Sequence, residues 1–105
     1  MSESKSGPVA TIVEIATFQL KDGVSIADFQ KLDKAVEVEH VSKQPGFVSR
    51  ESGSTEDGAW VAIVHWKTAA DAEASMASFG NAPAAADFMA NLDASTMQMT
   101  RYLLN

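Results

Sequence analysis

The side chains of this chain that suit acid–base chemistry or aromatic recognition are few: two histidines, two tryptophans and one tyrosine among 105 residues. A histidine can exchange a proton near neutral pH, and an indole offers an apolar face with one donor edge. The absence of cysteine excludes thiolate catalysis and cysteine-ligated metal centres. Phosphate loops, the Gly-x-Ser-x-Gly elbow and the His-Glu-x-x-His motif are also missing. The remaining candidates, besides carboxylates, are His40, His65, Trp60, Trp66 and Tyr102.

His40 follows Phe29, Leu32 and Val36 at helical spacing, which places the four residues on one stripe of a predicted helix. If this stripe faces a sheet, His40 could serve as a base or as a hydrogen-bond donor to a phenolic substrate. The structural alternative is a histidine at a helix end that contacts the last carbonyls and the negative end of the helix dipole. The sequence leaves both roles open.

The run from Gly58 to Lys67 predicts a strand that is apolar on both faces. One face carries Trp60, Ala62, Val64 and Trp66, and the other carries Val61, Ile63 and His65. Such a strand needs cover on both sides, and a chain of this length has helices for only one. We therefore expect a second copy to cover the other face, with His65 at the subunit interface. His40 would then lie on the opposite side of the sheet from His65, so no metal site shared by the two is expected.

Three further strands are predicted from β-branched residues and alternation, at residues 9–20, 47–54 and 94–104. The run 47–54 is more polar, as expected of an outer strand, and alternation places Phe47 on the opposite face from Arg50. In the last strand Arg101 falls on the more apolar face. A buried arginine needs a carboxylate, and Glu14 on the first strand is the candidate.

Turn and capping residues predict where the helices begin and end. Residues 25–28 and 68–71 have the Ser/Thr-x-x-Asp pattern of a capping box, so a helix begins after each. Pro45 and Gly46 end the first helix, and residues 80–83 end the second. A short third helix follows, and it carries Phe88, Met89 and Leu92.

The order β-α-β-β-α-β predicts an α+β, ferredoxin-like fold: a four-stranded antiparallel sheet with helices on one face. We expect a single domain over residues 9–105 after a short flexible tail, residues 1–8. The tail lacks the apolar stretch of a signal peptide, so a cytoplasmic protein is expected. A formal net charge of −6 without a basic stripe argues against nucleic acid and membrane surfaces as partners.

Two segments resemble the antibiotic-biosynthesis-monooxygenase-like dimeric α+β barrels: Gln44-Pro-Gly-Phe47, which closes the first helix, and residues 64–72, which lead from a strand into the second helix. The resemblance extends over nearly the whole chain from Val9. It implies a homodimer in which two sheets face each other, with a small-molecule pocket between each sheet and its own helices. Some members oxidise aromatic polyketide-like substrates with molecular oxygen and no cofactor, and others bind and degrade haem.

Haem degradation does not fit the residues. In the haem-degrading members a tryptophan ends the third strand, an asparagine lies on the first strand, and a histidine on the next helix ligates the iron. Trp66 meets the first requirement, but residues 15–20 contain no asparagine and residues 69–93 contain no histidine. No haem, metal or other cofactor is therefore expected.

The resemblance implies a cofactor-independent monooxygenase for a small phenolic or quinol substrate. His40 or a carboxylate would deprotonate the ring, and Trp66 and Tyr102 would position it while it reduces oxygen. The structural alternatives are core packing for Trp66 and closure of the barrel rim for Tyr102. The alternative function is a non-catalytic, small-molecule-binding or stress-associated homodimer. The side chains expected to bind the substrate are Trp66, Phe29, Val36, Met76 and Phe88.

Overall fold

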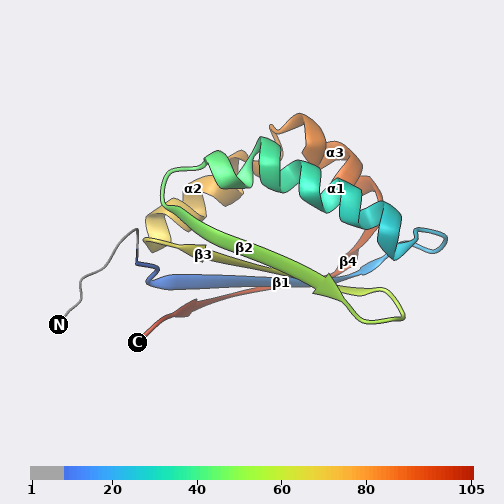
Figure 1. Ribbon diagram of the computed structural model, residues 1–105, viewed down its shortest axis with the longest axis horizontal. Coiled ribbons are helices and arrows are strands. Elements are labelled where there is room, and N and C mark those ends of the chain that lie inside the picture. Colours follow the sequence, from blue (N-terminus) through green and yellow to red (C-terminus); the bar gives the residue numbers. More distant parts are fainter. Residues whose placement is uncertain (1–8) are drawn as a thin grey trace.

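The computed structural model describes residues 9–105, and the tail predicted for residues 1–8 lies outside the described residues. Along the chain run β1 (Ile12–Leu20), α1 (Ile26–Glu39), the 3-10 turn η1 (Val41–Lys43), β2 (Phe47–Ser54), β3 (Ala59–Trp66), α2 (Ala69–Phe79), α3 (Pro83–Ala90) and β4 (Leu92–Leu103). The strands pair antiparallel in the order β2-β3-β1-β4, and the helices lie together on one face of the sheet (Figure 1). The predicted ferredoxin-like α+β fold is confirmed.

Helices α1 and α2 begin at the predicted caps. The hydroxyl of Ser25 accepts a hydrogen bond from the backbone N–H of Asp28 at 3.0 Å. Thr68 accepts from the N–H of Asp71 at 3.1 Å, and its hydroxyl donates to the Asp71 carboxylate at 2.8 Å. These bonds satisfy first-turn donors that have no partner inside the helix. No helix in the described part of the chain is long and apolar enough to cross a bilayer.

Aromatic side chains fill the space between α1 and the sheet. Phe29 of α1 packs edge-to-face on Trp60 of β3, with ring centroids 4.9 Å apart. Phe18 and Phe88 join this cluster at 5.7 Å and 5.0 Å from the Phe29 ring. Edge-to-face pairs of this kind add to the stabilisation from buried apolar area. Phe29 and Val36 are fully buried, so this part of the molecule is solid core.

Strand β3 alternates as predicted, with its tryptophan-bearing face buried against the helices. The opposite face has no helix over it among the described residues (Figure 1). There Ile63 and His65 of β3 lie beside Ile15 and Val13 of β1. The centre of this uncovered face is therefore apolar.

The predicted faces of β2 are wrong in one respect. The pairing of β2 with β3 is irregular between Phe47 and Ser49, so that Phe47 opposes Trp66 while Ser49 opposes His65. An irregularity of this kind shifts the alternation by one residue. As a result Phe47 and Arg50 lie on the same, helix-covered face, and the Phe47 ring packs 6.0 Å from that of Trp66.

Several predicted boundaries also differ. Helix α1 ends at Glu39, before Pro45 and Gly46, and the 3-10 turn η1 follows it. β1 begins at Ile12 and not at Val9. Leu92 is the first residue of β4, where it pairs with Leu20, and is not part of the third helix. Asn91 ends α3 immediately before the strand. Leu92 lies at helical spacing from Phe88 and was therefore assigned to the helix, but it is the first residue of β4.

Candidate functional site

A cavity of about 410 Å³ lies between the sheet and helices α2 and α3. Four methionines line it, from α2, α3 and β4: Met76, Met89, Met97 and Met99. Three of them, Met76, Met89 and Met99, are more than a third exposed, so flexible thioethers form the border between the cavity and solvent. The volume lies in the range of small-molecule sites.

Trp66 is the most deeply buried aromatic residue of the cavity wall, at 1% exposed. Its indole Nε1 has no hydrogen-bond partner among the described residues. A buried donor without a partner costs about 1–3 kcal/mol, which an acceptor on a bound molecule could recover. Trp60 also has an unpartnered Nε1 and is 2% exposed, but it does not line this cavity.

Glu14 of β1 contributes a carboxylate to the cavity wall and is 8% exposed. Arg101, directly opposite on β4, donates to Glu14 Oε2 from Nε at 3.1 Å and from Nη2 at 2.9 Å. Glu73 of α2 lies 3.7 Å from the remaining guanidinium nitrogen and is exposed to solvent. The predicted pairing of Glu14 with Arg101 is confirmed.

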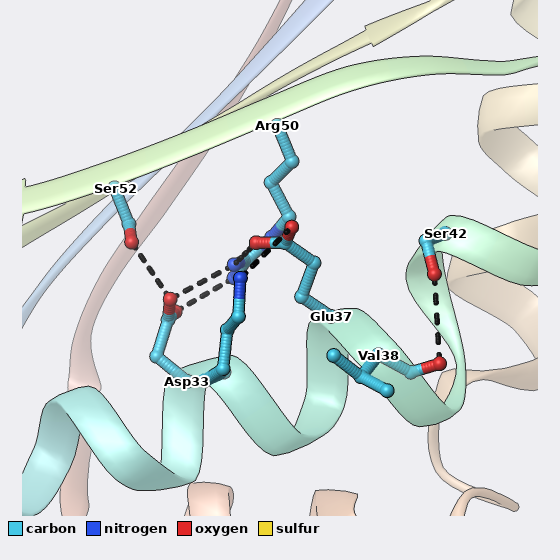
Figure 2. A network of polar contacts seen from close by, with 7 residues as sticks. Asp33, Glu37, Val38, Ser42, Arg50 and Ser52 are labelled. Atoms are coloured by element: carbon cyan, nitrogen blue, oxygen red, sulfur yellow. Dashed lines mark hydrogen bonds and ion pairs between the residues drawn. The ribbon is translucent and has the colours of Figure 1, made fainter.

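A second ion cluster joins β2 to α1 and was not predicted (Figure 2). Arg50 lines the cavity and donates to Asp33 Oδ1 and Oδ2 at 2.7 Å and 2.9 Å, and to Glu37 Oε1 at 3.3 Å. Ser52 adds a hydrogen bond to Asp33 at 2.7 Å. The side chains of Arg50 and Asp33 are only 4% and 6% exposed. Burial by itself would lower the pKa of Arg50, but the hydrogen bonds and charges of Asp33 and Glu37 outweigh it and raise that pKa.

The sequence contains a signal for this cluster. Asp33 lies four residues after Phe29 and three before Val36, on the buried stripe of α1. A carboxylate in that position needs a cation, because burial without one is costly. The spacing identifies Asp33 as a residue in need of a partner, although it does not say which of the eight lysines and arginines fills that role.

Three of the five predicted substrate-binding residues, Trp66, Met76 and Phe88, lie in the cavity wall. The other two, Phe29 and Val36, do not. Both are fully buried in the core cluster around Trp60, because the stripe of α1 that carries them packs directly on the sheet. The cavity opens beside α2 and α3, further along the sheet.

His40 lies at the end of α1 and does not line the cavity. It is 7% exposed, and its Nε2 is 3.4 Å from the carbonyl oxygen of Ser75 and 3.3 Å from the hydroxyl of Ser78. Its Nδ1 is 3.3 Å from Nε2 of Gln44. The ring therefore links the end of α1 to α2. Its role as a base stays a prediction that no contact with the cavity supports.

Tyr102 and His65 lie on the uncovered face of the sheet, away from the cavity. Both pair in register with Val13 of β1, from opposite sides. Tyr102 is 52% exposed, and His65 Nδ1 is 3.4 Å from the hydroxyl of Ser49. The position of His65 agrees with the predicted face. The catalytic role of Tyr102 stays a prediction, since a single chain does not bring it to the cavity.

By sequence, no family model and no curated protein matches this chain. By structure, it resembles SnoaB from Streptomyces nogalater, a cofactor-independent oxygenase, with a TM-score of 0.75 and 18% identity over 92% of this chain and 95% of that one. It also resembles the monooxygenase ActVA-Orf6 of Streptomyces coelicolor in complex with Nanaomycin D (TM-score 0.62, 20% identity, 91% and 88% covered). A third similar structure is NE2512 of Nitrosomonas europaea, a protein of unknown function (TM-score 0.65, 16% identity, 93% and 92% covered).

These comparisons establish the fold, which is that of the antibiotic-biosynthesis-monooxygenase-like proteins. The resemblance seen in the sequence is thereby confirmed at the level of fold. The same fold carries named oxygenases and a protein of unknown function, so activity has to be argued from the cavity.

Proposed function

We propose that this protein is a cofactor-independent monooxygenase that acts on a small phenolic or quinol substrate in the cavity beside Trp66. The observation that carries the proposal is the apolar cavity of about 410 Å³ with a buried, unpartnered indole N–H in its wall. The fold shared with SnoaB, a cofactor-independent oxygenase, and with ActVA-Orf6, whose structure holds Nanaomycin D, supports the same reaction class.

The proposed reaction needs no external reductant. A phenol with a free para position, such as 1-naphthol, reacts with O₂ to give the quinone and water. One oxygen atom stays on the ring as a carbonyl, and the other leaves as water with the phenolic hydrogen and the para hydrogen. The protein would hold the ring against the methionine and aromatic wall and limit access of water. The Trp66 N–H would donate to the substrate oxygen as negative charge develops on it.

The two tryptophans provide a matched test of this proposal. We expect Trp66→Phe to lower oxygen uptake by about a hundredfold, because the proposed reaction uses this N–H to stabilise the charge that develops on the substrate oxygen. Trp60→Phe removes an equally buried, unpartnered N–H outside the cavity, so it should leave uptake unchanged. An oxygen electrode with phenols of increasing ring number, together with quinone absorbance, measures the effect. Equal losses in the two variants would contradict the role of Trp66.

A second candidate function, non-catalytic binding of a small molecule, is favoured by one observation. The charged residues of the cavity wall, Glu14 and Arg50, are both held in ion pairs, and His40 is outside the wall. A small molecule retained in native mass spectrometry, with no oxygen uptake for any phenol tested, would favour binding over catalysis.

We also propose that the uncovered sheet face pairs with the same face of a second copy. The proposal is supported by the apolar centre of that face, formed by Val13, Ile15, Val61 and Ile63. In the single chain Val13 is 9% exposed, and Ile15, Val61 and Ile63 are partly exposed. A contiguous apolar patch on a protein surface marks an interaction site. Polar residues of the outer strands, among them Glu51 and Thr100, flank the centre.

Substitution at the centre of this face tests the dimer. We expect the unmodified protein to have twice the 11.2 kDa mass of one chain, and Ile63→Lys to have the mass of one chain, because a charge would then be buried in the interface. Val38→Lys is the control, since Val38 is 51% exposed on α1, away from the sheet. Light scattering after gel filtration gives the masses. A dimeric Ile63→Lys variant would place the interface elsewhere.

A further inference from the structure

We infer that the cavity selects its ligand by charge and that Glu14 sets the preference: a neutral phenol binds, and an aromatic anion of the same size is rejected. The inference rests on the proposed function for the aromatic class of ligand, and it adds a specificity that the proposed reaction does not require. It depends on how the two ion clusters present their charges to the cavity.

Glu14 presents the negative end of its ion pair to the cavity. Glu14 is one of the residues that line the cavity, whereas Arg101 is not. Both hydrogen bonds from Arg101 end on Oε2, and among the described residues no hydrogen bond engages Oε1. The guanidinium is shared with Glu73, on the solvent side. In this proposal a molecule in the cavity lies closer to the Glu14 carboxylate than to the Arg101 guanidinium.

Arg50, the cation of the wall, has its positive charge offset by two carboxylates. Its guanidinium donates three hydrogen bonds, two to Asp33 and one to Glu37. Two carboxylates thus oppose one guanidinium, and the same ratio holds for Glu14 and Glu73 around Arg101. The cluster of Glu14, Glu73 and Arg101 carries a net charge of −1, whereas Lys34, 3.9 Å from Glu37, brings the Arg50 cluster to zero.

A ligand anion would be repelled by this arrangement in a space where water screens charges poorly. Two like charges ~7 Å apart at an effective dielectric of ~20 repel by an energy that corresponds to roughly a fiftyfold weaker Kd. A neutral phenol avoids this cost. If its proton passes to Glu14, the negative charge moves from the carboxylate to the phenolate and the total charge stays the same.

The pairing of the strands places Glu14 and Trp66 close together in the cavity wall. Glu14 opposes Val64 of β3, and Trp66 lies two residues further along that strand on the same face. The two side chains are therefore diagonal neighbours on adjacent strands. A phenolic hydroxyl can donate to the Glu14 carboxylate, and an oxygen of the same ligand can accept from Trp66 Nε1.

Two probes with the same ring system test the inference: 1-naphthol, which is neutral at pH 7, and 1-naphthoate, which is an anion. In calorimetric titration the unmodified protein should bind 1-naphthol at least about tenfold more tightly than 1-naphthoate, and this ratio of the two Kd values is the readout. Glu14→Gln should lower this ratio severalfold, because the cavity wall loses the negative charge of Glu14 while Arg101 keeps its positive charge. Arg101→Gln should widen the ratio, because Glu14 loses its cation. Glu73→Gln changes the net charge by the same unit at a residue that is 74% exposed, and should leave the ratio as it was.

Equal affinities for the two probes in the unmodified protein would overturn the inference, as would absence of binding by 1-naphthol. A ratio that Glu14→Gln and Arg101→Gln leave unchanged would also overturn it. The two substitutions shift the ratio in opposite directions, so the test does not depend on one variant folding; circular dichroism checks each. Since the readout is binding, 1-naphthol that binds without oxygen uptake contradicts the proposed function and leaves the charge preference standing.

Discussion

Replacing Arg50 with methionine is expected to destabilise the fold by about 3–5 kcal/mol, the usual cost of leaving a buried charge without its partner. In the native structure the Asp33 side chain is 6% exposed and accepts two hydrogen bonds from Arg50. Without the guanidinium, the Asp33 and Glu37 carboxylates face each other across one turn of α1 (Figure 2). Urea unfolding followed by circular dichroism measures the change.

The double variant separates the cost of an unpaired charge from the value of the ion pair itself. Asp33→Leu combined with Arg50→Met should recover most of the lost stability, because replacing both partners by apolar groups removes the uncompensated charge. Lys34→Met is the surface control: Lys34 is 71% exposed and 3.9 Å from Glu37, so its loss should cost less than about 1 kcal/mol. An Arg50→Met variant as stable as the Lys34→Met variant would show that the cluster is solvated.

Gly46→Ala is expected to lower the free energy of unfolding by about 2–4 kcal/mol, more than the addition of one methyl group would indicate. Gly46 has a φ of +80°, in the left-handed region that alanine enters only with strain. A Cβ there would lie 2.6 Å from the Cβ of Asp71, so the Asp71 side chain would have to move and lose its hydrogen bond with Thr68. The Gly46 carbonyl accepts from Lys67 N–H at 2.8 Å, which restrains the backbone from yielding.

Gly23 provides the control for backbone strain alone. Its φ is +87°, and a Cβ there would meet nothing within 4 Å. Gly23→Ala should therefore cost only the conformational term of about 1–2 kcal/mol. The difference in unfolding free energy between the two variants measures the contact with Asp71. Equal costs would mean that Asp71 moves aside freely.

The elements that could be predicted from the sequence depend on residues close together in the chain. Capping at Ser25 and Thr68 is decided within one helical turn, and the two faces of β3 follow from strict alternation over eight residues. The Glu14–Arg101 pair spans 87 positions and was still predictable. Alternation placed Arg101 on the more apolar face of its strand, where an arginine needs a carboxylate, and Glu14 was the candidate on the first strand.

The candidate site was predicted less completely, for two physical reasons. One extra residue in β2 between Phe47 and Ser49 reverses the alternation, so the burial of Arg50 could not be deduced by counting from Phe47. His40 lies on the same helical stripe as Phe29 and Val36, but one further turn along α1 takes it past the sheet to the serines of α2. Periodicity gives the face of a helix and not the element that packs against it.

The sequence by itself determined the ferredoxin-like order, the helix starts and the double-faced strand, because these follow from short-range sterics, capping and periodicity. Only the tertiary structure decided where the sheet and helices leave a cavity, and that Trp66, Met76 and Phe88 line it while Phe29 and Val36 fill the core. Whether a buried apolar residue lines a space or fills one depends on how far apart the packed elements lie. That separation depends on all the side chains between the elements together.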